Sequence, residues 1–288
     1  MTGTGTQRML VAGIAATAGL AGLAYRRRRR TTTGLPSLPS RLDQIDEIKG
    51  LAMLGVLGLH TLTAEQLDQT GAQFTIGQSV PVFVGLMGLN ATASMWKRGD
   101  RGLRDLYTSD YVRRRIDRLY VPFLAVLGAS GAVALQEGTL TARGVAGSLV
   151  SGILPHGGPG NYFVTLAIEF AAVFPLMYWA YRRAPEAVVA SSFVIGAAFE
   201  IVAAHSAIPP YVYGASILRF LPMIALGMLL ADRMLNQPQL PTWWLPAGLV
   251  SLAYLVAVTH DPSVVPVGAY GAPKLGQTFL GVFYPALM

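Results

Sequence analysis

Two ionisable residues, Lys49 and His60, bracket an apolar run in the stretch RLDQIDEIKGLAMLGVLGLH, which covers residues 41–60. On an α-helix the two side chains would lie about 20° apart around the axis and about 16 Å apart along it. A histidine titrates near neutral pH and can accept a proton as a general base. The spacing therefore indicates a chemical site on one helix face. The alternative is that Lys49 snorkels to lipid headgroups and His60 is a boundary residue.

Three further charged residues interrupt apolar segments: Glu169 in YFVTLAIEFAAVFPLM, Glu200 in FVIGAAFEIVAAH and Arg219 in GASILRFLPM. A charge in hydrocarbon costs at least about 2.5–3.5 kcal/mol and usually faces a bundle interior or a water-filled cavity. Each residue alone is equally consistent with a structural role. As a set, they predict one polar cavity in which Arg219 pairs with a glutamate.

The composition indicates that lipid surrounds most of the chain. Apolar residues make up 52% of the 288 residues and charged residues 13%, against about 25% charged in soluble domains. The net charge of +7 comes largely from blocks beside apolar segments, such as RRRRR at 26–30. Such blocks set membrane topology, so no nucleic-acid partner is expected. Since there is no cysteine, disulfides, thiolate metal sites and cysteine nucleophiles are excluded, and no metal site is predicted.

These side chains must be positioned by membrane-spanning helices, each of about 17–25 mostly apolar residues. The predicted fold is an all-α, polytopic transmembrane bundle of about nine spans, with eight to ten as the range. The spans are expected at residues 9–25, 48–64, 76–96, 119–136, 160–181, 187–207, 211–231, 242–259 and 275–288. The first segment is weak because it is rich in Ala and Gly, and a signal-peptide core is its alternative.

The distribution of basic residues predicts the orientation of these spans. If the loops alternate sides, 17 of the 22 Lys and Arg fall in the loops 26–47, 97–118, 182–186 and 232–241. Basic loops lie in the cytoplasm, which places the amino terminus outside if the first span inserts. The same topology places all four histidines on the extracytoplasmic side: His60, His156, His205 and His260.

The segment around Asp46, Lys49 and His60 resembles the first conserved helix of the acyltransferase-3 family of integral-membrane acyltransferases. In that helix an acidic residue is followed by Arg or Lys, ten residues and His. Four later segments resemble further family motifs in the same order: 79–99, 111–123, 158–177 and 218–233. Lys49 stands where Arg is commoner, so a bidentate guanidinium contact is unavailable. Met87 stands near the usual place of a serine.

The resemblance implies an O-acyltransferase of the cell membrane, with its catalytic domain at 48–288 after a weak span and Arg-rich linker at 1–47. The donor would be cytosolic acyl-CoA, commonly acetyl-CoA, used as a co-substrate with no permanently bound cofactor. The acceptor would be a hydroxyl of an extracytoplasmic glycan or lipid-linked envelope molecule, and membrane lipids would surround the protein.

We expect His60, Lys49 and Glu169 to be the catalytic residues. The basic cluster on the cytoplasmic side offers a landing place for the phosphates of CoA, or it sets topology alone; it consists of Arg113, Arg114, Arg115 and Arg118. The groups expected to bind substrate or to stabilise charge are Arg219, Glu200, His205 and Tyr162. Three alternatives stay open: a small-molecule transporter, a heparan-glucosaminide N-acetyltransferase-like enzyme, and an inactive membrane scaffold.

Overall fold

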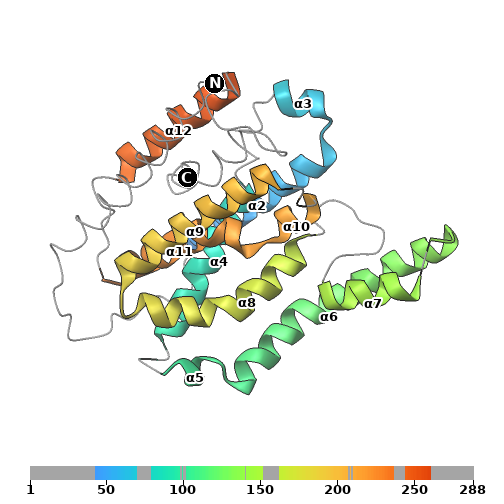
Figure 1. Cartoon of the computed structure of the whole chain (residues 1–288), viewed down its shortest axis with the longest axis horizontal. Coiled ribbons are helices and arrows are strands. Elements are labelled where there is room, and N and C mark those ends of the chain that lie inside the picture. The colour runs from blue at the N-terminus through green and yellow to red at the C-terminus, as the bar shows by residue number, and fades with distance from the viewer. Residues whose placement is uncertain are drawn as a thin grey trace. The chain divides into compact units, whose positions relative to one another are not determined.

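The computed structural model of the chain describes residues 43–69, 79–97, 99, 102–139, 141–151, 162–206, 208, 210–236 and 244–260. Every regular element in this part of the chain is an α-helix, which confirms the all-α prediction there (Figure 1). The helices are α2 Asp43–Thr61, α3 Ala64–Gln69, α4 Ser79–Trp96, α5 Leu103–Leu106, α6 Ser109–Gln136, α7 Ala142–Ser151, α8 Tyr162–Tyr181, α9 Pro185–His205, α10 Pro210–Ala215, α11 Ile217–Asn236 and α12 Trp244–His260.

Several of these helices are long and apolar enough to cross a membrane. Four stretches meet both criteria: Leu103–Gln136, Phe163–Tyr181, Pro185–Ala203 and Val212–Asn236. Helices α2, α4 and α12 coincide with three more of the expected spans. The expected spans at 9–25 and 275–288 lie outside the described residues, so the total of nine stays a prediction.

The chain divides into two compact units. The first comprises residues up to 97, 180–207 and 218 onward, and thus holds α2, α3, α4, α9, most of α11 and α12. The second comprises residues 98–179 and 208–217, and thus holds α5, α6, α7, most of α8 and α10.

Helices α2, α4 and α11 share an apolar core in the first unit. Its buried members are Ile45, Ala52, Val82, Leu86, Leu89 and Ala231. On α2 the buried residues recur at the helical period, so one stripe of that helix faces the core. The opposite side of α2 exposes large apolar side chains to the outside: Leu51, Met53, Leu54 and Leu57. This two-sided apolar character suits a helix that packs on protein with one face and on lipid with the other.

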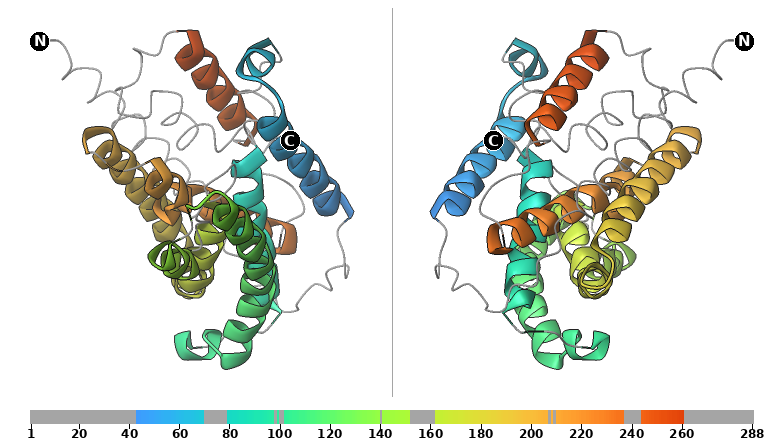
Figure 2. Two further views of the ribbon diagram at one scale, coloured as in Figure 1. Left: turned by 90° about the vertical axis from the view of Figure 1, so that its right-hand side faces the viewer. Right: turned by 90° about the vertical axis from the view of Figure 1, so that its left-hand side faces the viewer.

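Glycines allow α4 and α11 to cross with their backbones in contact (Figure 2). A Cβ atom added to Gly88 would lie 2.6 Å from the carbonyl oxygen of Ile224. A Cβ atom added to Gly227 would collide with the carbonyl oxygen of Gly85. Small residues at helix contacts of this kind let membrane helices approach closely enough for backbone packing.

In the second unit, α6 begins earlier than expected. The sequence places residues 97–118 in a loop and starts the span at 119, whereas α6 runs unbroken from Ser109 to Gln136. The Thr108 hydroxyl caps the helix by accepting a hydrogen bond from the backbone N–H of Tyr111 at 3.1 Å. Basic and acidic residues in the first turns then pair one turn apart, so a segment too polar to be a span is still a helix.

Candidate active site

Lys49 and His60 lie on one unbroken helix, as expected, because α2 is continuous from Asp43 to Thr61. The Lys49 Nζ donates a hydrogen bond to Oδ1 of Asp46 at 3.0 Å, one turn earlier on the helix. The two side chains are 38% and 35% exposed. The acidic and basic residues of the first motif therefore form a half-exposed ion pair.

His60 lies at the carboxyl end of α2, and its side chain is exposed. Helix α2 ends at Thr61, and a reciprocal capping box formed by Thr63 and Gln66 starts α3. The backbone N–H of Thr63 donates to Oε1 of Gln66 at 2.9 Å, and the backbone N–H of Gln66 donates to the Thr63 hydroxyl at 3.3 Å. The sequence thus presents an accessible imidazole at a helix end.

Glu200 and Arg219 form a buried ion pair between α9 and α11, and this confirms that Arg219 pairs with a glutamate. The Arg219 Nε lies 3.7 Å from the Glu200 Oε1, and the two side chains are 15% and 5% exposed. One turn away, a Cβ atom on Gly196 would lie 2.9 Å from Cγ of Pro222. Gly196 therefore allows α9 and α11 to approach each other closely beside the two charges.

Glu169 has a partner that the sequence did not indicate. Its Oε2 accepts a hydrogen bond from the backbone N–H of Ile217 at 2.7 Å. Ile217 is the first residue of α11, and the first backbone N–H groups of a helix have no partner within it. The Glu169 carboxylate therefore caps α11 two residues before Arg219. A backbone partner 48 residues away leaves no signal in sequence spacing.

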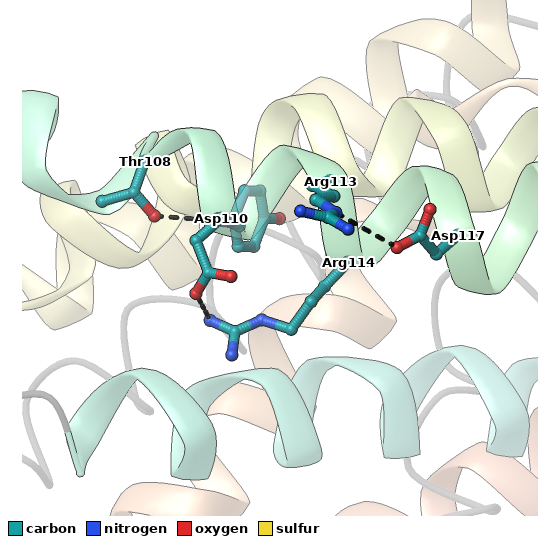
Figure 3. A network of polar contacts seen from close by, with 6 residues as sticks. Thr108, Asp110, Arg113, Arg114 and Asp117 are labelled. Carbon is teal, nitrogen blue, oxygen red and sulfur yellow. Dashed lines mark hydrogen bonds and ion pairs between the residues drawn. The ribbon is translucent and has the colours of Figure 1, made fainter.

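The four arginines on α6 differ in their surroundings, although the sequence treats them alike. Arg114 pairs with Asp110, and the Arg113 Nε lies 3.8 Å from the Asp117 Oδ2 (Figure 3). The guanidinium carbon of Arg115 lies 5.4 Å from the centre of the Tyr111 ring. Arg118 is exposed and makes no ion pair with any residue that the structure describes.

His205 and Tyr162 are the end residues of α9 and α8, and their side chains lie outside the described part of the molecule, as does His156. Their proposed roles stay predictions. Of the other candidates, Lys49, His60, Glu200 and Arg219 belong to the first unit, and Glu169 and the α6 arginines belong to the second.

A family model described as an acyltransferase domain matches residues 42–284. The chain belongs to the acyltransferase 3 family. The match confirms the resemblance, and it continues beyond the last of the similar segments, residues 218–233. Together with the apolar helices, it identifies a multi-pass membrane acyltransferase. Comparison with curated proteins and with solved structures finds no match.

Proposed function

We propose that this acyltransferase moves an acyl group, commonly acetyl, from acyl-CoA to a hydroxyl of an extracytoplasmic glycan or lipid-linked envelope molecule. The observation that carries the proposal is the unbroken helix α2, which holds the Asp46–Lys49 pair and carries the exposed His60 in its last turn. The chain around it matches the family over residues 42–284.

The proposed reaction uses the imidazole of His60 as general base. The imidazole takes the proton of the acceptor hydroxyl as its oxygen attacks the thioester carbonyl carbon. The new C–O bond forms, the C–S bond breaks, and the proton passes to the departing thiolate of CoA. The products are an ester and free CoA, and no other reactant is needed.

The donor and acceptor would approach His60 from opposite sides of the membrane. Half of a hydrocarbon core is about 15 Å thick, and Lys49 lies about 16 Å from His60 along the same helix face. A pantetheine arm is long enough to cover that distance. We place this arm beside the Lys49–His60 face, with the phosphates of CoA on the cytoplasmic side, where the basic loops are predicted.

The buried Glu200–Arg219 pair supports a polar site within the apolar helices. Burying two charges is costly even when they are paired, so a chemical use explains the pair better than stability does. In the proposed mechanism Arg219 stabilises the negative charge that develops on the thioester oxygen. Glu200 holds the guanidinium for this role.

The proposal is tested in whole cells that express the wild type, His60→Ala or the control Leu57→Ala at matched membrane levels. Leu57 is an exposed residue on the same helix. Alkali-labile acyl esters in purified envelope glycans and lipids are measured by mass spectrometry. We expect the esters with the wild type and Leu57→Ala and none with His60→Ala. Esters that persist with His60→Ala would remove the histidine from the mechanism, and an alkali-stable amide product would show N-acylation instead.

A further inference from the structure

A proline in the middle of α8 creates an unusual hydrogen-bonding need. Pro175 lies within the helix and has no N–H to donate to the carbonyl of Ala171, four residues earlier. Carbonyl groups inside a membrane protein need a partner within the protein, because the hydrocarbon offers none. The carbonyl of Ala171 therefore needs a donor from outside its own helix.

Tyr111 of α6 supplies that donor. Its hydroxyl donates to the carbonyl oxygen of Ala171 at 2.8 Å, and the Tyr111 side chain is only 4% exposed. The backbone N–H of the same residue is held by the hydroxyl of Thr108 at the start of α6. Tyr111 is thus fixed at both ends, through its amide and through its phenol.

The ring of Tyr111 also supports an arginine. The guanidinium of Arg115 lies over the ring, with 5.4 Å between its carbon and the ring centre, and the two residues are one turn apart on α6. A cation over an aromatic face is attracted by the ring electrons. Arg115 is half-buried, whereas Arg113 and Arg114 are exposed and each lies beside an aspartate.

We propose that Tyr111 is a positioning residue that holds the guanidinium of Arg115 for a phosphate of the acyl donor, and that Pro175 fixes Tyr111 in turn. The inference rests on the proposed use of acyl-CoA. A planar guanidinium forms two parallel hydrogen bonds to a phosphate, and a side chain that is already ordered loses less entropy on binding. A lipid phosphate has the same chemistry as the phosphates of CoA, and the experiment separates the two sources.

The first test compares Tyr111→Phe, Tyr111→Leu and Arg115→Ala in purified protein reconstituted in phosphatidylcholine vesicles, with acetyl-CoA as donor. We expect Tyr111→Leu to raise the KM for acetyl-CoA about three- to tenfold and to leave kcat nearly unchanged. Tyr111→Phe keeps the ring and should raise KM less. Combining Tyr111→Leu with Arg115→Ala should add nothing to Arg115→Ala alone.

Tyr107 provides a matched control. Its hydroxyl donates to the neighbouring carbonyl of Ala172, and its ring meets that of Tyr111 edge to face. Tyr107 lies between α5 and α6, and Tyr107→Phe removes the same kind of hydrogen bond to the backbone of α8. We expect it to lower the melting temperature and leave the KM for acetyl-CoA unchanged. If Tyr107→Phe raised the KM for acetyl-CoA as much as Tyr111→Phe does, Tyr111 would be a purely structural residue and the inference would be overturned.

The second test uses Pro175→Ala, which restores the backbone N–H that serves the Ala171 carbonyl. Tyr111→Phe should lower the melting temperature in the wild-type background and have little effect in the Pro175→Ala background. Equal effects in both backgrounds would show that the hydroxyl is not anchored on a carbonyl freed by the proline.

Failure of the inference and failure of the proposed function give different results. Acyl transfer by the wild type with an unchanged KM in Tyr111→Leu would overturn only the inference. If the wild type transfers no acyl group, the readout becomes the rise in melting temperature on adding free CoA. A rise that Tyr111→Leu abolishes would support the inference. The melting temperature could instead rise with phosphatidylglycerol vesicles and not with CoA, and do so only when Tyr111 is present. That result would assign the phosphate to lipid and overturn the inference.

Discussion

Two stretches of the molecule are similarly apolar and yet differ greatly in burial. In Val212–Asn236, which contains α11, 72% of the apolar 18-residue segment is buried, whereas in Leu103–Gln136, which contains α6, the share is 17%. Hydropathy measures the transfer of a segment from water and cannot tell protein from lipid as the surroundings. Helix α11 is therefore a core helix, whereas α6 presents most of its surface outward, so substitutions in the two helices should act by different routes.

The largest effect is expected from the buried charges on α9 and α11. Glu200→Leu leaves Arg219 without this carboxylate inside the first unit and should cost about 3–5 kcal/mol of stability. Replacing both residues with leucine should recover most of that stability without recovering activity. Melting temperatures of the single and double variants in detergent would check this. If the double variant were no more stable than Glu200→Leu, the broken Glu200–Arg219 pair would not be the cause of the lost stability.

The next largest effect is expected from a glycine on α11, compared with a glycine on α6. Gly227→Ala places a methyl group against the carbonyl oxygen of Gly85, and overpacking of this kind costs about 1–3 kcal/mol. The control is Gly131→Ala on α6, where an added Cβ meets nothing within 4 Å; this change should be neutral or stabilise by up to about 1 kcal/mol. Denaturant or thermal unfolding of both variants measures the contrast, and similar losses at both positions would contradict it.

Glu169 gives a sharper contrast between capping and catalysis. Glutamine keeps an oxygen that accepts the N–H of Ile217, so Glu169→Gln should retain most of the stability. The acyl-transfer rate should also be retained if Glu169 acts only as a cap, and lost if it has the catalytic role expected from the sequence. Glu169→Leu removes the cap and should cost about 0.5–2 kcal/mol. Rates at matched protein levels decide between the roles. A catalytic carboxylate would instead make Glu169→Gln inactive while it remains folded.

The smallest effect is expected on the outward face of α6. Arg113→Ala breaks an ion pair whose side chains are 83% and 60% exposed, and such pairs contribute about 0–1 kcal/mol. Its melting temperature should therefore stay close to that of the wild type. Arg118→Ala should also fold normally but should weaken the use of acetyl-CoA. A rise in the KM for acetyl-CoA with Arg113→Ala equal to that with Arg118→Ala would show that these two arginines contribute alike, whatever their different surroundings on α6.

Much of the architecture could be predicted from the sequence, because a long apolar segment in lipid must pair its own backbone N–H and C=O groups, and a helix does so. The common helix of Lys49 and His60 and the pairing of Arg219 with a glutamate both follow from local spacing and the cost of buried charge. The early start of α6 was missed because a loop assignment based on charge ignores the Thr108 cap and the pairs that stabilise a polar helix.

The remaining site features depend on contacts between segments far apart in the chain. The capping of α11 by Glu169 and the bond from Tyr111 to Ala171 both end on backbone atoms, which have no residue type to recognise in a sequence. Pro175 can be read from the sequence, but the hydroxyl that bonds to the carbonyl freed by it belongs to Tyr111, 60 residues before Ala171.

The contact between α4 and α11 has a consequence for how this family can diverge. A side chain at Gly88 or Gly227 meets main-chain atoms, which cannot move aside as a flexible side chain can. The restriction is steric and is indifferent to whether the protein catalyses anything. A relative that has lost acyl transfer is therefore free to replace His60 but must still keep the smallest residue at these crossings. Comparing the two kinds of position across relatives would separate chains that retain the chemistry from chains that retain only the bundle.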